Sequence, residues 1–134
     1  MILDTSYLGD LMARNEGALN RSREMDESPE PVRLPTAVVW EVFYGLGKMG
    51  NSSRTTTFRR KYDQVIAGTV AADLTDDVAR RAGTLRGKHA ASDRLSDLDG
   101  VDSIVAAHGL ILDEPVVAGD GDFEDVGGLD VVTY

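Results

Sequence analysis

The 134-residue sequence contains no cysteine, only three lysines and no long apolar run. Without cysteine there is no disulfide framework, no thiolate metal site and no thiol nucleophile. No apolar segment approaches the roughly 20 residues that cross a bilayer, and the first residues, MILDTSYL, lack the basic and apolar regions of a signal peptide. We therefore expect a cytoplasmic protein with no membrane partner. The length fits one domain with its own core.

Acidic side chains outnumber basic ones by 23 to 14, which gives a formal net charge of −9. An acidic surface that is poor in lysine suits a cytoplasm of high salt concentration, because carboxylates stay hydrated while the screening length falls to roughly 3 Å at 1 M salt. The composition therefore favours a halophile as the source. The negative charge does not exclude a nucleic-acid partner, since local contacts and metal bridges dominate under strong screening.

Short β-branched runs alternate with helical patterns along the chain, which predicts an α/β fold with a parallel sheet. Thr36, Thr75 and Asp99 are predicted to cap helices. The first helical stretch carries Leu8 and Leu11 on one face, together with Met12. The expected strands are MIL, VRLP, TVAADL, PVVAG and LDVVTY, and the expected helices cover residues 5–27, 37–50, 51–68, 75–95 and 100–110.

Four carboxylates lie where such a fold would gather them. The crevice of an open parallel sheet lies beyond the carboxyl ends of its strands, and Asp4 and Asp120 each follow a strand-like run. Asp102 falls in the first turn of a helix. Glu41 interrupts VVWEVF, an otherwise apolar helix, and a buried ionised carboxylate needs water or a cation as its partner. Taken singly, Asp4 and Asp102 are also explained as acids of helix starts.

The segment GDGDF holds two of the acids, Asp120 and Asp122. An ordinary Asp-Gly turn explains the segment equally well. If the turn serves a site, Gly119 and Gly121 let the backbone turn sharply and direct Asp120 into the crevice, while Phe123 returns to the core.

Carboxylates that are brought within a few Å of one another repel, and a bound cation relieves this repulsion. Hard oxygen ligands suit Mg²⁺ or Mn²⁺. The two histidines, His89 and His108, are isolated in the sequence, and we expect surface or helix-end positions for both. An incomplete carboxylate cage that leaves waters on Mg²⁺ is the arrangement used for phosphate chemistry.

Four segments resemble, in order and spacing, the acidic motifs of the PIN-domain ribonucleases, most closely the VapC-type toxins of toxin–antitoxin pairs. They are MILDTSYL, PTAVVWEVFYGL, DGVDSIVAAHGL and PVVAGDGDFEDVGGLDVVTY. The resemblance covers essentially the whole chain. It implies a single PIN-like nuclease domain over residues 1–134, a three-layer α/β/α domain with a central, mainly parallel sheet.

The resemblance also implies a function. It is that of an endoribonuclease that depends on Mg²⁺ or Mn²⁺, acts on RNA as a toxin and is neutralised by a VapB-like antitoxin. Toxins of this kind commonly form homodimers. The alternative is a non-toxin or inactive PIN domain that acts as an RNA-processing or binding module. Carried over by position, the implied catalytic and metal-binding acids are Asp4, Glu41, Asp102 and Asp120, with Asp122 as a further metal ligand and Thr5 and Ser6 as hydrogen-bonding supports.

Two details of the motifs stay open. Asp97 and Asp99 are possible substitutes near the third acidic position. Many members of the family have Thr or Ser two residues before the fourth acid, whereas this chain has Ala118, so a supporting hydroxyl is missing there.

RNA binding requires cationic contacts, for which the segment RTTTFRRKY is the candidate. It carries Arg59, Arg60 and Lys61 beside Phe58 and Tyr62, so it could hold phosphates while an aromatic ring stacks on a base. A solvated helix face explains the same residues without any ligand.

Two other phosphate-handling folds are alternatives for this sequence. A receiver-type signalling domain needs a lysine near the end of a late strand, and none follows Lys88. A haloacid-dehalogenase-like phosphatase needs a second aspartate two residues after the first, where this chain has Ser6.

Overall fold

A parallel sheet of five strands forms the centre of the protein, in the computed structural model that describes residues 1–134. The strand order is β3-β2-β1-β4-β5, and each neighbouring pair is parallel. The predicted α/β fold with a central parallel sheet is therefore confirmed. The strands are β1 (Ile2–Leu3), β2 (Arg33–Pro35), β3 (Val70–Ala72), β4 (Val116–Val117) and β5 (Val131–Val132).

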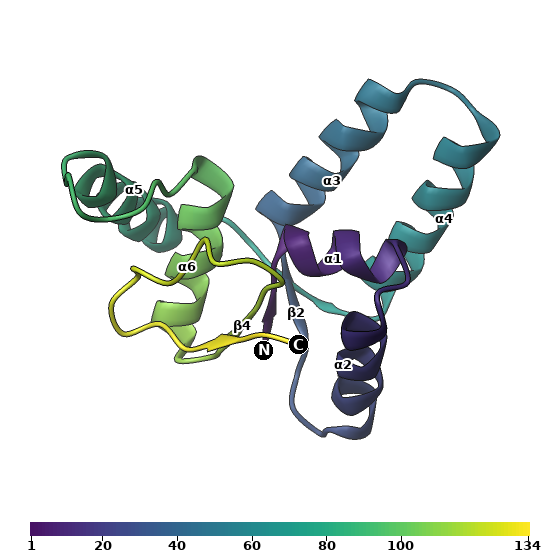
Figure 1. Cartoon of the computed structure of the whole chain (residues 1–134), viewed down its shortest axis with the longest axis horizontal. Coiled ribbons are helices and arrows are strands. Elements are labelled where there is room, and N and C mark those ends of the chain that lie inside the picture. Colours follow the sequence, from purple (N-terminus) through teal and green to yellow (C-terminus); the bar gives the residue numbers. More distant parts are fainter.

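Helices cover both faces of this sheet, which gives three layers (Figure 1). One face is covered by α6, which contacts β1, β2 and β4 and carries α5 on its outer side. The helices α1 and α2 lie on the other side, and α3 and α4 project from it as a hairpin (Figure 1). Their bounds are α1 (Thr5–Met12), α2 (Glu16–Glu27), α3 (Thr36–Met49), α4 (Ser53–Ala67), α5 (Asp76–Ala90) and α6 (Gly100–Leu112).

Two of the three predicted helix caps are confirmed. The side chains of Thr75 and Asp99 accept hydrogen bonds from first-turn amides of α5 and α6, at 3.3 and 2.8 Å. The predicted cap at Thr36 is wrong, because β2 runs into α3 directly and Thr36 is already the first helical residue after Pro35. Its hydroxyl instead accepts the N–H of Leu74 at 3.4 Å.

Two predicted helices depart from the structure, and the other three agree with it to within two residues at each end. The stretch 5–27 is two helices, because Arg14 takes a positive φ of 60° and Asn15 then caps α2 through a 3.1 Å hydrogen bond from Ala18 N–H. The stretch 75–95 ends as a helix at Ala90.

The core lies between the sheet and its helices. Ile2 of β1 and both valines of β4 are fully buried, and Phe123 is 1% exposed, as its predicted return to the core requires. Leu8 is buried, whereas Leu11 and Met12 of the same helix are half-buried.

The two histidines are buried rather than at the surface, at 5% and 4% exposure. His89 lies at the end of α5, where its Nδ1 is 2.9 Å from the carbonyl oxygen of Ser96, so its predicted helix-end position is correct. The prediction for His108 is wrong. It lies within α6, its Nε2 has no hydrogen-bond partner, and burial lowers its pKa.

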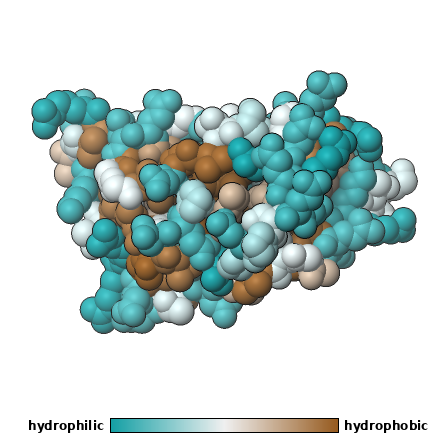
Figure 2. All heavy atoms as spheres, turned by 90° about the horizontal axis from the view of Figure 1, so that it is seen from below, coloured by the Kyte–Doolittle hydropathy of each residue, from teal (hydrophilic) through white to brown (hydrophobic).

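The surface is not uniformly polar. Figure 2 shows one face on which hydrophobic residues gather in the middle, with hydrophilic residues around them. None of the helices combines the length and apolar character that crossing a membrane requires. Large apolar residues that remain exposed on the whole molecule are Trp40, Tyr44, Met49, Val70, Leu74, Leu95, Ile111 and Leu112.

Candidate acidic site

Asp4 is the most deeply buried acid of the protein, at 2% exposure. It directly follows β1 and is the N-cap of α1. Its Oδ2 accepts hydrogen bonds from the backbone N–H and the hydroxyl of Ser6, at 3.0 and 2.7 Å. Its Oδ1 is buried with no hydrogen-bond partner. An unpaired carboxylate oxygen at this depth is costly unless a proton or a cation reaches it.

Ser6 connects the beginning of α1 to the segment that carries the fourth acid. Its Oγ accepts the backbone N–H of Gly119 at 3.1 Å, in addition to donating to Asp4. We refer to residues 119–122 as the acidic turn. Within this turn the N–H of Asp122 donates to Oδ1 of Asp120 at 3.4 Å. The acidic turn therefore lies against the start of α1, beside Asp4.

Glu41 approaches the same region from α3. The hydroxyl of Thr5 donates to Glu41 Oε2, so the first residue of α1 holds the glutamate. Glu41 is half-buried and lines a cleft of about 260 Å³ together with Gly45, Phe58 and Tyr62. Gly45 faces open space on this side, because a Cβ built there would contact no side chain within 4 Å.

The pKa of Asp102 is raised to about 8. Burial is the main cause, and the negative charges of Asp99, Asp4, Asp122 and Glu41 add to it. Asp102 lies in the first turn of α6, so carboxylates from four different parts of the chain repel one another here. Such repulsion is relieved by a proton or by a cation.

Two other acids of this group also have raised pKa values. Burial raises the pKa of Asp4, the hydrogen bonds from Ser6 oppose this, and the charge of Asp120 adds to it. Burial raises the pKa of Asp122. The negative charge of Asp120 and the hydrogen bond between the two side chains raise it further. Asp120 is thus electrostatically coupled to both.

The structure therefore brings the predicted acids to one end of the sheet, although no three acidic or histidine side chains stand close enough to enclose a metal ion. Asp99 belongs to this neighbourhood, because it caps α6 and acts on Asp102. Asp97 is exposed and is not among the charges that shift Asp102. The acids predicted from the sequence are Asp4, Glu41, Asp102, Asp120 and Asp122, and their roles stay predictions.

The predicted RNA-binding cations lie on α4, which packs against α3. The Arg59 guanidinium lies 5.9 Å from the centre of the Phe43 ring, and the Lys61 ammonium lies 6.0 Å from that of Phe58. Arg60 is exposed. Because Phe58 also lines the cleft beside Glu41, this part of α4 borders the acidic region.

Replacing Glu41 by Gln should leave the unfolding free energy of the metal-free protein equal or slightly higher. Glutamine retains an oxygen that accepts the Thr5 hydroxyl, and the change removes one of the charges that act on Asp102. Urea unfolding in a chelating buffer measures the difference. A clear loss of stability would show that the charge of Glu41 has a structural partner.

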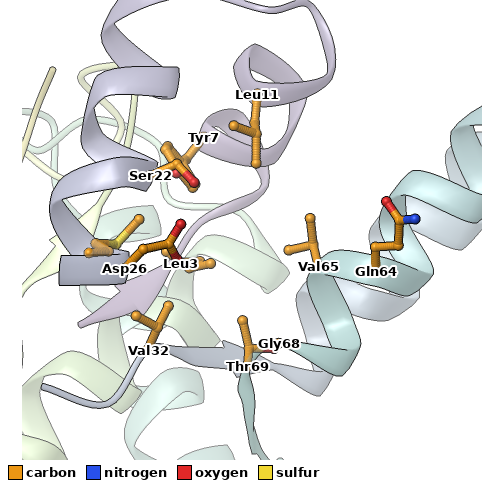
Figure 3. Close-up of a pocket in the computed structure, with 11 residues that line it drawn as sticks. Leu3, Tyr7, Leu11, Ser22, Asp26, Val32, Gln64, Val65, Gly68 and Thr69 are labelled. Carbon is orange, nitrogen blue, oxygen red and sulfur yellow. The ribbon is translucent and has the colours of Figure 1, made fainter. Parts of the chain in front are cut away.

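A separate hollow of about 180 Å³ lies between α1, α2 and α4 (Figure 3). Tyr7 and Leu11 enter it from α1, Asp26 from α2 and Val65 from α4 (Figure 3). None of the five acids lines it. It is therefore distinct from the acidic site.

Sequence reasoning missed two residues that contact the acidic turn, Asp10 and Tyr134. The Tyr134 hydroxyl donates to Asp10 Oδ2 at 2.8 Å and lies beside Gly119. The two residues are 124 positions apart, and no local pattern in the sequence links them.

Comparison with known proteins agrees with this architecture. The family model of the PIN domain matches residues 1–129, and no curated protein matches the chain. Similar solved structures include VapBC2 from Rickettsia felis bound to a DNA fragment from its promoter, with a TM-score of 0.82, 16% identity, and coverage of 98% of this chain and 96% of that one. VapBC-5 from Mycobacterium tuberculosis has a TM-score of 0.73 and 23% identity, with 99% of this chain and 97% of that chain covered.

A third similar structure is VapC20 from Mycobacterium tuberculosis, described as a sarcin–ricin loop cleaving toxin. Its TM-score is 0.70 at 21% identity, and 94% of each chain is covered. At these identities the structural likeness establishes the fold alone. The family match extends over all the acidic segments, from the one after β1 to the acidic turn. The chain therefore belongs to the PIN domain family.

Proposed function

We propose that this protein is a metal-dependent endoribonuclease, a VapC-type toxin that cleaves RNA and is neutralised by a cognate antitoxin. One observation carries the proposal: Asp4 Oδ1 is buried without a hydrogen-bond partner at the end of the sheet where the charges of Glu41 and Asp122 also act on Asp102. The membership of the PIN family supports a nuclease. The toxin role is supported by similar structures that are toxin–antitoxin complexes, and by one described as a toxin that cleaves the sarcin–ricin loop.

The chemistry of these side chains suits a divalent cation, although as they stand no three of them are close enough to enclose one. They offer only carboxylate oxygens, the hard ligands that Mg²⁺ and Mn²⁺ prefer, and Asp4 Oδ1 is buried without any other partner. When bound, the ion would offset the mutual repulsion of the acids and stabilise negative charge on the phosphate. The ligands would come from Asp4, Glu41, Asp102, Asp120 and Asp122.

The neighbouring hydroxyl groups orient these acids. Ser6 holds one oxygen of Asp4 with two hydrogen bonds, which leaves the other oxygen free for the cation. Thr5 holds Glu41 in the same way with a single hydrogen bond. These contacts fix the carboxylates before any ligand arrives, which lowers the cost of ordering them on binding.

The RNA would lie along the cleft between α3 and α4. Arg59, Arg60 and Lys61 would contact its phosphates, and the rings of Phe58 and Tyr62 at the cleft would stack on unpaired bases. Local contacts of this kind tolerate the net charge of −9, particularly under the high salt predicted from the composition.

The antitoxin would occupy the hollow of Figure 3 with apolar side chains and reach the acidic site with arginine. Tyr7, Leu11 and Val65 offer the apolar lining of that hollow, and Asp26 at its edge favours a basic segment. Arginine suits the acidic site because its planar fork binds carboxylates bidentately.

A second copy of this chain would cover the exposed rings of α3, in line with the predicted homodimer. Trp40 and Tyr44 stack with their ring centres 5.4 Å apart and are 63% and 55% exposed. Trp40 also borders an apolar hollow of about 380 Å³ with Leu74 and Ile104. Exposed aromatic clusters of this kind are typical of protein interfaces.

The purified protein should cleave single-stranded RNA in the presence of Mn²⁺ or Mg²⁺, and a chelator should abolish the cleavage. Restoring the cation should restore it, because removal of the ion leaves the folded protein intact. Cleavage that persists in chelator would contradict the metal dependence. The toxin proposal predicts that a small protein encoded beside this gene copurifies with the nuclease and stops the cleavage. The alternative of an inactive or RNA-processing PIN domain predicts no neighbouring antitoxin gene.

A further inference from the structure

Tyr134 contacts three segments that are distant in the sequence. Its hydroxyl donates to Asp10 Oδ2 of α1 at 2.8 Å. Its ring packs edge-on against that of Tyr7, with the centres 5.4 Å apart and an interplanar angle of 74°. A Cβ added to Gly17, at the start of α2, would lie 3.2 Å from its ring carbon Cδ2. The tyrosine is therefore packed between the first two helices.

The third segment is the acidic turn. A Cβ on Gly119 would overlap the hydroxyl of Tyr134 and the carboxylate of Asp10. The φ of Gly119 is not positive, so glycine is required here by the close approach of these groups and not by the backbone conformation. The pair Tyr134–Asp10 thus closes directly over the backbone of the turn.

Gly119 is held from two directions. Its N–H donates to Ser6 Oγ, which also binds Asp4, and its Cα lies against the Tyr134 hydroxyl. Asp120 follows directly and is itself exposed, with one weak hydrogen bond from within the turn. The place of Asp120 therefore depends on where Gly119 is held.

The contact of Tyr134 with the acidic turn also bears on the hydroxyl that is missing at position 118. Ala118 is fully buried and has no polar group to offer the turn. Besides the Ser6 hydroxyl, a second hydroxyl next to the turn comes from Tyr134, beyond β5. Burial and the Asp10 carboxylate raise the pKa of Tyr134, so the hydroxyl keeps its proton and continues to donate at physiological pH.

We propose that Tyr134 and Asp10 are positioning residues that hold the acidic turn and thereby set the position of Asp120 in the metal site. Neither residue needs to touch the cation or the RNA. The proposal rests on the proposed function only in taking Asp120 as a metal ligand.

The test compares Tyr134→Phe with the wild type in two measurements that use no RNA. The variant keeps the ring and loses only the hydroxyl, so the Gly119 amide should exchange with solvent faster and Mn²⁺ should bind about threefold to tenfold more weakly, the factor that one lost hydrogen bond supplies. Exchange is followed by NMR and binding by calorimetry.

Tyr7→Phe is the matched control, because it removes the hydroxyl from the other ring of the same pair. The Tyr7 hydroxyl faces the carbonyl oxygen of Ala18 and not the acidic turn. In this variant the exchange of the Gly119 amide and the affinity for Mn²⁺ should match those of the wild type.

A second comparison uses the steric contact. Gly119→Ala should weaken Mn²⁺ binding by itself, because the added methyl group must displace the Tyr134–Asp10 pair. Adding Tyr134→Phe to Gly119→Ala should then have little further effect, since the contact is already broken. Fully additive losses would contradict a shared action of the two residues.

Two results would overturn the proposal. One is an exchange rate of the Gly119 amide that is the same in Tyr134→Phe and the wild type. The other is a wild type that binds Mn²⁺ and a Tyr134→Phe variant that binds it with the same affinity. Failure of the proposed function appears differently. A wild type that binds no Mn²⁺, or that binds it and cleaves no RNA, contradicts the nuclease, while the exchange of Gly119 still reports on the Tyr134–Asp10 pair.

Discussion

Replacing Asp4 by Asn should abolish metal-dependent RNA cleavage, with a loss of about 10²–10³-fold or more, the range seen when one preorganised charged or polar group is removed from an active site. Asparagine keeps an oxygen that accepts both hydrogen bonds from Ser6. It loses the negative charge and places an amide group where the unpaired Oδ1 now lies. The variant should therefore be folded and unable to bind the cation with wild-type affinity.

The matched control for this change is Asp97→Asn. Asp97 lies in the same acidic protein and was a possible site residue by sequence, but it is exposed and does not act on Asp102. Cleavage rates and Mn²⁺ affinity, measured beside circular dichroism spectra of all three proteins, should separate the two positions. Cleavage by Asp4→Asn at the wild-type rate, or equal losses in both variants, would contradict the assignment of Asp4.

Local sequence signals predicted the elements that form the sheet and most helix starts. Short runs rich in apolar residues identified all five strands, although β2 (Arg33–Pro35) contains no β-branched residue. Thr75 and Asp99 were recognised as caps from their residue type and position alone. The expected crevice also follows from topology, since Asp4 and Asp120 come after β1 and β4, which are neighbours in the sheet.

Features that depend on tertiary contacts were not predictable in this way. The break between α1 and α2 requires a positive φ at Arg14, for which arginine gives no signal. The burial of His108 follows from the packing of α6 between the sheet and α5. Asp10 and Tyr134 meet because the chain returns to α1 after β5, a pairing that one sequence without relatives does not reveal.

The second prediction with a large effect concerns pH. The pKa of Asp102 is about 8 in the folded protein, against 3.8 for an unperturbed aspartate. Between these values the folded state holds a proton that the unfolded state has released, so the unfolding free energy falls as the pH rises. The stabilising contribution of the protonated carboxyl is complete below about pH 4 and is lost as the pH passes through 8.

Asp102 is partly open to solvent, and screening therefore reduces the full linkage value to about 1–2 kcal/mol between pH 5 and pH 9. Asp4 and Asp122 shift in the same direction, whereas the lowered pKa of His108 makes stability rise with pH below about 6.5, so the total slope does not isolate Asp102. The difference between wild type and Asp102→Asn does, because all other groups are common to both proteins.

In chelating buffer, the Asp102→Asn protein should be more stable than the wild type at pH 9 by about 1–2 kcal/mol and nearly equal to it at pH 5. Urea unfolding at the two pH values measures the difference, with Asp97→Asn as the control that should follow the wild type at both. Mg²⁺ should raise the stability of the wild type at pH 9 and leave that of Asp102→Asn less affected, since the cation replaces the proton among the repelling carboxylates. Parallel wild-type and Asp102→Asn curves between pH 5 and pH 9 would mean that the carboxyl group of Asp102 titrates with an ordinary pKa and that the acids do not repel one another as their arrangement requires.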